Sequence, residues 1–258
     1  MTLETSPNFS MDLSGQAALV TGASSGLGMR FAKVLAAAGA DVVACGRRAD
    51  RLDSLAAEAR GAPGKITALT VELSDADQVS ALVARASEAA GLISILVNCA
   101  GIPDAQFATR MPLELIDKVI AINLRAPFIL SAEMARRLIA AKRPGRIVNI
   151  SSMSAFDYAG GAASLYSATK AGLNRMTEAL AMEWAPYNIN VNAIAPGAFF
   201  SDMMDAMLTR TGDISARFPR KRIGDPAQLD GALLYLVSPS SDFVTGTCIK
   251  VDDAQYHR

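Results

Sequence analysis

The apolar residues of this chain fall into two kinds of segment that alternate along it. Short runs rich in valine, isoleucine, leucine and alanine predict buried strands, and the longer amphipathic stretches between them predict helices. The strand-like runs lie at 17–20, 41–45, 66–73, 93–101, 146–152, 189–197 and 247–253. The helix-like stretches lie at 29–38, 48–60, 75–91, 113–140, 164–185 and 227–238. Apolar strands separated by helices are typical of a parallel sheet that is covered on both faces.

The alternation therefore predicts an α/β protein with a doubly wound, parallel, seven-stranded sheet. No linker, repeat or change of composition divides the chain, which indicates one domain over residues 13–258 behind a polar N-terminal extension of residues 1–12. The segment 199–225 interrupts the alternation after a strand. Long connections at such a position often cover a ligand site, so we expect this segment to act as a lid.

Composition narrows the classes of partner. Hydrophobic residues make up 51% of the chain and charged residues 19%, which is enough for a sizeable core. The 25 basic residues balance 25 acidic ones, so no excess charge favours nucleic acid or an anionic membrane. We find no apolar run long enough for a membrane span and no signal-peptide pattern. Together with three scattered cysteines, these features predict a reduced, cytoplasmic protein.

The histidine count limits the chemistry. His257 is the only histidine, which argues against a histidine-based metal site and against a Ser-His-Asp triad. We therefore expect no metal. Acid–base catalysis near neutral pH must then use another residue type with a shifted pKa.

A glycine-rich stretch, TGASSGLG at residues 21–28, lies between the first strand and the first helix. Gly22, Gly26 and Gly28 allow a tight turn and a close backbone approach to a ligand, and the helix N-terminus offers N–H groups to a phosphate. A glycine turn needed only for packing is the alternative. The position of TGASSGLG at the first strand–helix junction favours a dinucleotide site over this alternative.

Six motifs in register resemble the short-chain dehydrogenase/reductase family. They are TGASSGLG, NCAG at 98–101, Asn123, Ser152, YSATK at 166–170 and the Pro196-Gly197 pair. The resemblance spans residues 13–253. It implies a Rossmann-type fold, a nicotinamide cofactor and hydride transfer at a carbonyl or alcohol carbon. It also implies the following cofactor contacts: Gly22, Ser24, Ser25, Gly26, Leu27, Gly28, Arg47, Arg48, Glu72, Leu73, Asn98, Ala100, Gly101, Tyr166, Lys170, Pro196, Gly197, Phe199 and Ser201.

The choice between NADP(H) and NAD(H) depends on the end of the second strand. NAD-using relatives resemble one another in an aspartate that bonds the ribose 2′-hydroxyl, and here Gly46 takes that place. Arg47 and Arg48 follow, and a guanidinium suits a 2′-phosphate. We expect NADP(H), with Arg47 as the main contact and NAD(H) as the weaker alternative. Both arginines could instead belong to a solvated helix start.

Tyr166 and Lys170 form the best acid–base pair in the chain. Residues four apart share one face of a helix, and a nearby ammonium lowers the pKa of a phenol. Ser152, at the end of a strand, is expected to hold the substrate carbonyl against the Tyr166 hydroxyl, with Ser151 and Ser154 as competitors. The resemblance assigns Asn123 a bound water that links Lys170 to solvent. The expected catalytic set is Asn123, Ser152, Tyr166 and Lys170.

The substrate contacts are expected to be Ser152 and Tyr166, with Tyr158 and Phe200 on an otherwise apolar wall that also includes Phe156 and Phe199. The predicted activity interconverts a ketone and a secondary alcohol. An NAD-dependent alcohol dehydrogenase, a non-catalytic nucleotide-binding regulator and an epimerase are the alternatives. By analogy with the family, we expect a homotetramer formed through the two long helices.

Overall fold

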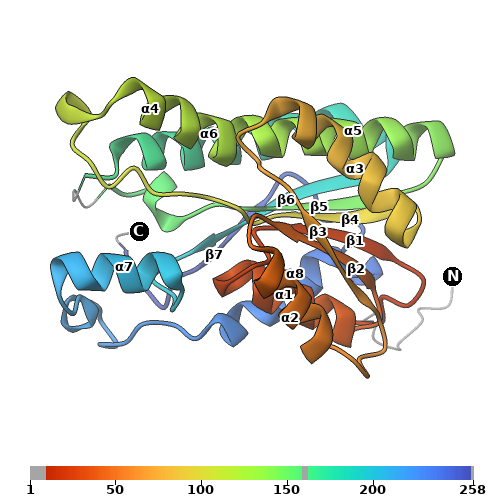
Figure 1. Ribbon diagram of the computed structural model, residues 1–258, viewed down its shortest axis with the longest axis horizontal. Helices are drawn as coiled ribbons and strands as arrows, with labels where there is room; N and C mark the ends of the chain where they lie inside the picture. Colours follow the sequence, from red (N-terminus) through yellow and green to blue (C-terminus); the bar gives the residue numbers. More distant parts are fainter. Residues whose placement is uncertain (1–9, 159–161, 257–258) are drawn as a thin grey trace, which may run out of the picture.

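The computed structural model describes residues 10–158 and 162–256, and its centre is one parallel sheet (Figure 1). Residues 1–9 of the expected N-terminal extension lie outside this range, as do residues 159–161. The seven strands follow the order β3-β2-β1-β4-β5-β6-β7. They are β1 (Ala17–Thr21), β2 (Asp41–Gly46), β3 (Ile66–Thr70), β4 (Ile93–Asn98), β5 (Gly145–Ile150), β6 (Ile189–Pro196) and β7 (Cys248–Val251). All neighbouring strands pair in parallel, which confirms the predicted doubly wound α/β sheet.

Helices cover both faces of the sheet (Figure 1). One layer contains α1 (Gly26–Ala37), α2 (Ala49–Glu58) and α8 (Asp230–Val237). The other contains α3 (Ala76–Ala90), α4 (Leu113–Ile120), α5 (Ala126–Ala141) and α6 (Ser164–Trp184). Because alternate strand residues point to opposite faces, Leu19 packs in the α3, α5 and α6 layer, whereas Ala18 and Val20 pack in the α1 and α8 layer.

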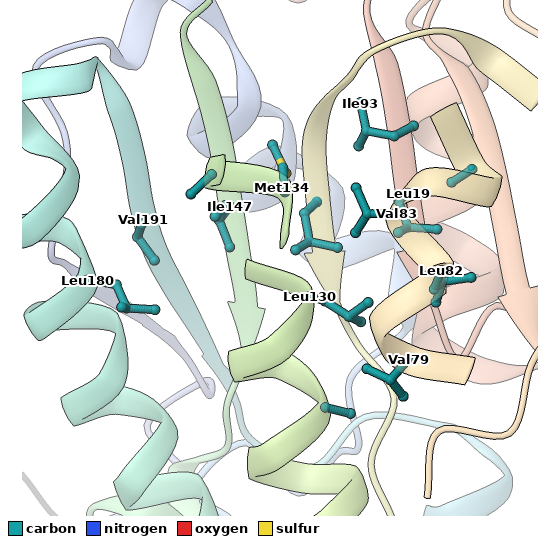
Figure 2. Close-up of a cluster of buried hydrophobic side chains, with 14 of the residues drawn as sticks. Leu19, Val79, Leu82, Val83, Ile93, Leu130, Met134, Ile147, Leu180 and Val191 are labelled. Carbon is teal, nitrogen blue, oxygen red and sulfur yellow. The ribbon is translucent and has the colours of Figure 1, made fainter. Parts of the chain in front are cut away.

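The core on the α3 and α5 side explains why the strands are apolar throughout. Figure 2 shows Leu82 and Val83 of α3 and Leu130 of α5 directed toward Leu19 and Ile147 of the sheet. These side chains are at most 1% exposed, so the sheet has no solvent-facing side here. Replacing such a leucine with alanine typically costs about 2–5 kcal/mol.

The predicted long helix at 113–140 is divided in the structure. A π-turn at Ala121–Arg125 separates α4 from α5. Pro127 lacks an N–H group and cannot bond the carbonyl oxygen of Asn123 four residues earlier, and the N–H of Ala126 instead bonds Ala121 five residues back. The turn therefore releases the backbone carbonyl of Asn123 from the helical ladder.

The segment expected to form a lid has its own structure. It contains α7 (Asp202–Thr211) and a short 3₁₀ turn at Ser215–Arg217. It begins and ends at one place, because Phe199 forms a parallel bridge with Gly224. Arg220 and Arg222 of the basic PRKR run both pair with Asp253, so one carboxylate offsets part of their charge. Within residues 10–158 and 162–256, no helix is long and apolar enough to cross a membrane.

Candidate active site

Two loops meet at the carboxyl edge of the sheet where the strand order reverses between β1 and β4. The Thr21 hydroxyl accepts hydrogen bonds from the backbone N–H groups of Cys99 and Ala100, at 3.0 and 3.1 Å. A Cβ on Gly22 would lie 2.9 Å from the Cα of Ala100, so the loops approach this closely only because Gly22 has no side chain. Open parallel sheets bind ligands in the crevice at such a switch point.

The glycine-rich loop leaves the N-terminus of α1 open. Gly22 and Gly26 adopt positive φ angles of 71° and 52°, and a Cβ on Gly28 would collide with the carbonyl oxygen of Gly22. Ser25 is the N-cap residue, but its side chain makes no capping hydrogen bond, and the first turn contains no acidic residue. The first N–H groups of α1, including that of Leu27, can therefore face an anion. This cradle fits the pyrophosphate of a dinucleotide.

Arg48 borders the same loop. Its Nη2 donates a 2.7 Å hydrogen bond to the Ser25 hydroxyl, and its Nε donates a 3.3 Å bond to the Ser24 hydroxyl. On the other side its Nη1 lies 3.2 Å from the Asp202 carboxylate at the start of α7. Gly46 is buried against Ser24, and a Cβ at position 46 would lie 3.3 Å from the Ser24 hydroxyl oxygen. An aspartate at position 46 would be crowded here.

Arg47 points elsewhere. Its Nη1 lies 4.0 Å from the Glu72 carboxylate, and both side chains are more than a third exposed. Glu72 is further occupied, since it accepts hydrogen bonds from the backbone and the hydroxyl of Ser74. Leu73 is buried beside it. Of the two arginines, Arg48 is the one that lies against the glycine-rich loop.

Asn98 at the end of β4 has a buried side chain that serves the interior of the fold. Its amide donates to the Ser131 hydroxyl at 3.2 Å and to the side-chain oxygen of Asn149 at 2.8 Å. Asn149 in turn donates to Thr177 on α6. This polar chain ties β4 and β5 to the helices above them. Any cofactor contact at this position must therefore come from the backbone.

The end of β6 and the start of the segment 199–225 also lie beside the glycine-rich loop. A Cβ on Gly197, directly after Pro196, would collide with the side chain of Gln255. Ser201 caps α7, and its Cβ lies 3.2 Å from the place of a Cβ on Gly26. Phe199 is buried and packs against Gly224, so its ring belongs to the core and does not line an open pocket. Phe200 is half exposed.

Three of the predicted catalytic side chains come together beside Gly101. Tyr166 and Lys170 share one face of α6, with Lys170 Nζ 5.7 Å from the centroid of the Tyr166 ring. Lys170 is buried and donates a 2.7 Å hydrogen bond to the carbonyl oxygen of Ile150, at the end of β5. Ser152, two residues further on, lies close enough to Tyr166 to lower the pKa of its hydroxyl. A Cβ on Gly101 would lie 3.4 Å from Lys170 Nζ, so this glycine keeps the space around the lysine open.

The neighbouring serines are not equivalent. Ser151 is buried, and its hydroxyl donates to the backbone carbonyl of Lys170 at 3.2 Å. The Ser152 hydroxyl accepts a bond from the backbone N–H of Ser154 at 3.1 Å. Among the three, Ser152 is the one that lowers the pKa of Tyr166. Tyr158 is half exposed.

Burial controls the protonation of the reactive pair. It raises the pKa of Tyr166 to about 12, although Ser152 acts in the opposite direction. It lowers the pKa of Lys170 to about 8, because a buried ammonium loses its hydration. Desolvation is the largest influence on the Tyr166 pKa in the protein without cofactor. The expected lowering of this pKa by Lys170 stays a prediction. Burial also raises the pKa of the Cys99 thiol to about 12, so this thiol stays protonated at neutral pH.

Asn123 has a structural part that the sequence did not predict. Its side-chain oxygen accepts from the backbone N–H of Ile102 at 2.9 Å, and its amide donates to the Ile102 carbonyl at 3.0 Å. The amide also contacts the Thr169 hydroxyl on α6 at 3.2 Å. Asn123 therefore joins the loop after β4 to the catalytic helix, and Pro127 removes the α-helical donor to its backbone carbonyl.

Two residues near the reactive centre escaped sequence reasoning. Tyr256 lies close enough to Ser154 for the serine to lower its pKa, and close enough to Tyr166 to raise the pKa of the Tyr166 hydroxyl. The departure of the C-terminal segment VDDAQY from the family pattern was the available signal. Asp104 contacts the first turn of α6. No motif marked it.

The fold and this crevice define a Rossmann-type protein with a dinucleotide cradle beside a Ser-Tyr-Lys constellation. A family model described as short chain dehydrogenase matches residues 16–211. The chain is 36% identical to the 3-oxoacyl-[acyl-carrier-protein] reductase FabG of Thermotoga maritima, over 94% of this chain and 98% of that protein. It is also 36% identical to the 2-dehydro-3-deoxy-D-gluconate 5-dehydrogenase of Formosa agariphila, over 93% and 92% of the two chains.

The solved structures agree. A 3-oxoacyl (acyl-carrier-protein) reductase from Agrobacterium tumefaciens, crystallised with NADP bound, superposes with a TM-score of 0.87 at 27% identity, over 95% of each chain. The protein belongs to the short-chain dehydrogenase family and is an oxidoreductase.

Proposed function

We propose that the protein is an NADP(H)-dependent oxidoreductase that interconverts a ketone and a secondary alcohol, with Tyr166 as the general acid and base. One observation carries the proposal. Tyr166 is partly buried, which keeps its phenol protonated, and it lies near Ser152 with Lys170 Nζ 5.7 Å from its ring centroid, at the edge of the sheet where the glycine-rich loop forms its cradle. A protonated phenol can donate a proton to a carbonyl oxygen, which is the acid step of a reduction.

The proposed cofactor site uses groups that the fold leaves available. The open N-terminus of α1 would hold the pyrophosphate. Arg48 with the hydroxyls of Ser24 and Ser25 would hold the 2′-phosphate of NADP(H), and the absence of a side chain at Gly46 supports that choice over a ribose diol. The bound NADP in the Agrobacterium reductase supports the same assignment.

In the proposed reaction, the bound nicotinamide supplies or accepts a hydride. Ser152 donates a hydrogen bond to the substrate oxygen and holds it beside the Tyr166 hydroxyl, where negative charge develops during reduction. Tyr166 gives its proton to that oxygen, so the ketone becomes a secondary alcohol. Lys170 provides a nearby proton source, since a pKa of about 8 leaves it mostly protonated at pH 7. In the reverse direction, Tyr166 must lose its proton first.

A cofactor-consumption assay tests the proposal. The full chain is mixed with NADPH or NADH and a panel of ketones, which includes 3-oxoacyl thioesters and deoxy-keto sugar acids because the relatives act on such compounds. We expect turnover with NADPH on at least one ketone. Tyr166→Phe should lose about 10²- to 10⁴-fold in kcat while retaining NADPH binding. Cofactor binding without turnover of any ketone or alcohol would favour a nucleotide-binding regulator.

A further inference from the structure

Asp104 connects the loop after β4 to the helix that bears the catalytic tyrosine. Its side chain is only 3% exposed. One carboxylate oxygen accepts hydrogen bonds from the backbone N–H groups of Leu165 at 2.8 Å and Tyr166 at 3.2 Å. The other accepts from the N–H of Ala105 at 2.9 Å. A buried carboxylate with three backbone donors is firmly fixed, and two of those donors belong to the first turn of α6.

The helix has no cap of its own at this end. Ala163 is the N-cap residue of α6 and has no side-chain acceptor, and Ala162 before it adopts a left-handed φ of 61°. A carboxylate at a helix N-terminus satisfies otherwise unpartnered N–H groups and interacts favourably with the helix dipole. Asp104 supplies this contact from a position about 60 residues away, next to the residue that must be placed most accurately.

The loop that carries Asp104 is itself anchored to α6. Asn123 holds Ile102 through two hydrogen bonds and touches Thr169, and the Thr169 hydroxyl donates to the Tyr166 carbonyl at 2.8 Å. Tyr166 is therefore held at its N–H by Asp104 and at its carbonyl through Thr169. Its backbone position is determined by the loop after β4 as well as by its own helix.

We propose that Asp104 is a positioning residue for Tyr166, which fixes the first turn of α6 and places a negative charge at the backbone of the catalytic tyrosine. This inference rests on the proposed function. The charge opposes formation of the phenolate and so preserves the proton-donating form of the tyrosine.

Other groups also face the Tyr166 hydroxyl and must be considered in any pH profile. Burial raises the pKa of Tyr166 most, Ser152 lowers it, and Tyr256, Cys99 and Asp104 raise it further. Lys170 lies over the same ring. The effect of Asp104 is therefore measured as a difference between variants in which all of these groups are kept.

Two substitutions of Asp104 separate its effect on the backbone position of α6 from the effect of its charge. Asp104→Asn keeps an oxygen for α6 but removes the charge, whereas Asp104→Ala removes both. Asp75→Asn and Asp75→Ala are matched controls, because Asp75 caps α3 through the N–H groups of Asp77 and Gln78 and is exposed. Each full-length variant is assayed for ketone reduction at pH 7, for alcohol oxidation as a function of pH, and for its melting temperature.

We expect Asp104→Ala to lose about tenfold or more in kcat for reduction with less than about a twofold change in the KM for NADPH, because a small displacement of a catalytic group is costly. Asp104→Asn should keep most of the reduction rate. Because alcohol oxidation needs the deprotonated tyrosine, the limb of the pH profile on which oxidation rises should move to lower pH in this variant. The Asp75 variants should lower the melting temperature and leave both kinetic profiles unchanged.

Wild-type kcat in Asp104→Ala, or an unmoved limb in Asp104→Asn, would overturn the inference and leave Asp104 as an ordinary helix cap. Turnover that depends on Tyr166 but not on Asp104 refutes only this inference. If the wild type turns over no substrate, the proposed function fails instead. In that case the ionisation of Tyr166 can still be followed with pH, as the part of the phenolate absorbance that is lost in Tyr166→Phe. An unchanged midpoint of this titration in Asp104→Asn would refute the charge effect. An inactive, unfolded Asp104→Ala leaves the decision to Asp104→Asn.

Discussion

Lys170 Nζ lies 5.7 Å from the centre of the Tyr166 ring and donates a 2.7 Å hydrogen bond to the carbonyl oxygen of Ile150. Burial affects the two groups in opposite senses, since it raises the pKa of the tyrosine to about 12 and lowers that of the lysine to about 8. In both cases the pKa shifts in the direction of the neutral form, although Lys170 stays mostly protonated at pH 7. The protein without cofactor therefore keeps the phenol protonated and holds a lysine that is ready to release its proton.

The buried lysine should make stability depend on pH in a defined window. Between the folded pKa of about 8 and the ordinary value of 10.5, the unfolded chain binds more protons than the folded one. Lys170 alone therefore adds about 3 kcal/mol of stability as pH rises across this window, and the Cys45 and Cys99 thiols, whose pKa values burial raises to about 12, act in the opposite direction above pH 9. Lys170→Met should lose this rise in denaturant titrations, whereas Lys65→Met on the surface should keep it. Parallel curves for wild type and Lys170→Met would contradict the prediction.

Ser152→Ala should reduce kcat for reduction by about 10²- to 10³-fold, because the substrate oxygen loses a hydrogen-bond donor at the point where charge develops. The same change removes the serine hydroxyl that lowers the pKa of Tyr166. The limb of the pH profile on which alcohol oxidation rises should therefore move to higher pH. Ser154→Ala is the comparison. If Ser154→Ala shows the larger loss and the limb shift, the serine has been assigned wrongly.

Arg48→Ala should weaken the preference for NADPH over NADH more than Arg47→Ala. The Arg48 guanidinium lies against Ser24 and Ser25, whereas Arg47 faces Glu72. A charge-assisted bond to phosphate is worth about 1.5–3 kcal/mol, which predicts a roughly tenfold to hundredfold loss in kcat/KM for NADPH. The value for NADH should change little. A larger effect of Arg47→Ala would restore the sequence-based choice of Arg47.

Tyr256→Phe should change the handling of the ketone while cofactor binding stays the same. The Tyr256 hydroxyl lies near Ser154 and Tyr166, and the segment is fixed because Gln255 accepts a 2.6 Å bond from the N–H of Ala198. We expect a several-fold higher KM for the ketone, of the order of one lost hydrogen bond. Tyr187→Phe, on an exposed 3₁₀ turn, is the control. Equal KM values in both variants would remove Tyr256 from the substrate site.

Local pattern was sufficient for the sheet and for the positions of the motifs. Apolar runs such as 93–98 are buried on both faces, so a run of consecutive apolar residues is enough to predict a strand there. The long helix at 113–140 was predicted but not its π-turn, because that irregularity depends on the position of one proline relative to Asn123.

The order of strands and helices, the glycine-rich loop and the Tyr166–Lys170 spacing could be read from the sequence alone, because each follows from neighbouring residues and the period of a helix or strand. Only the folded chain shows that Arg48 bonds Ser25 of the glycine-rich loop, that Asp104 bonds the backbone of Tyr166, and that Tyr256 and burial raise the pKa of the Tyr166 phenol. Contacts across tens of residues and the loss of hydration on burial arise only when the chain is packed. No local pattern encodes them.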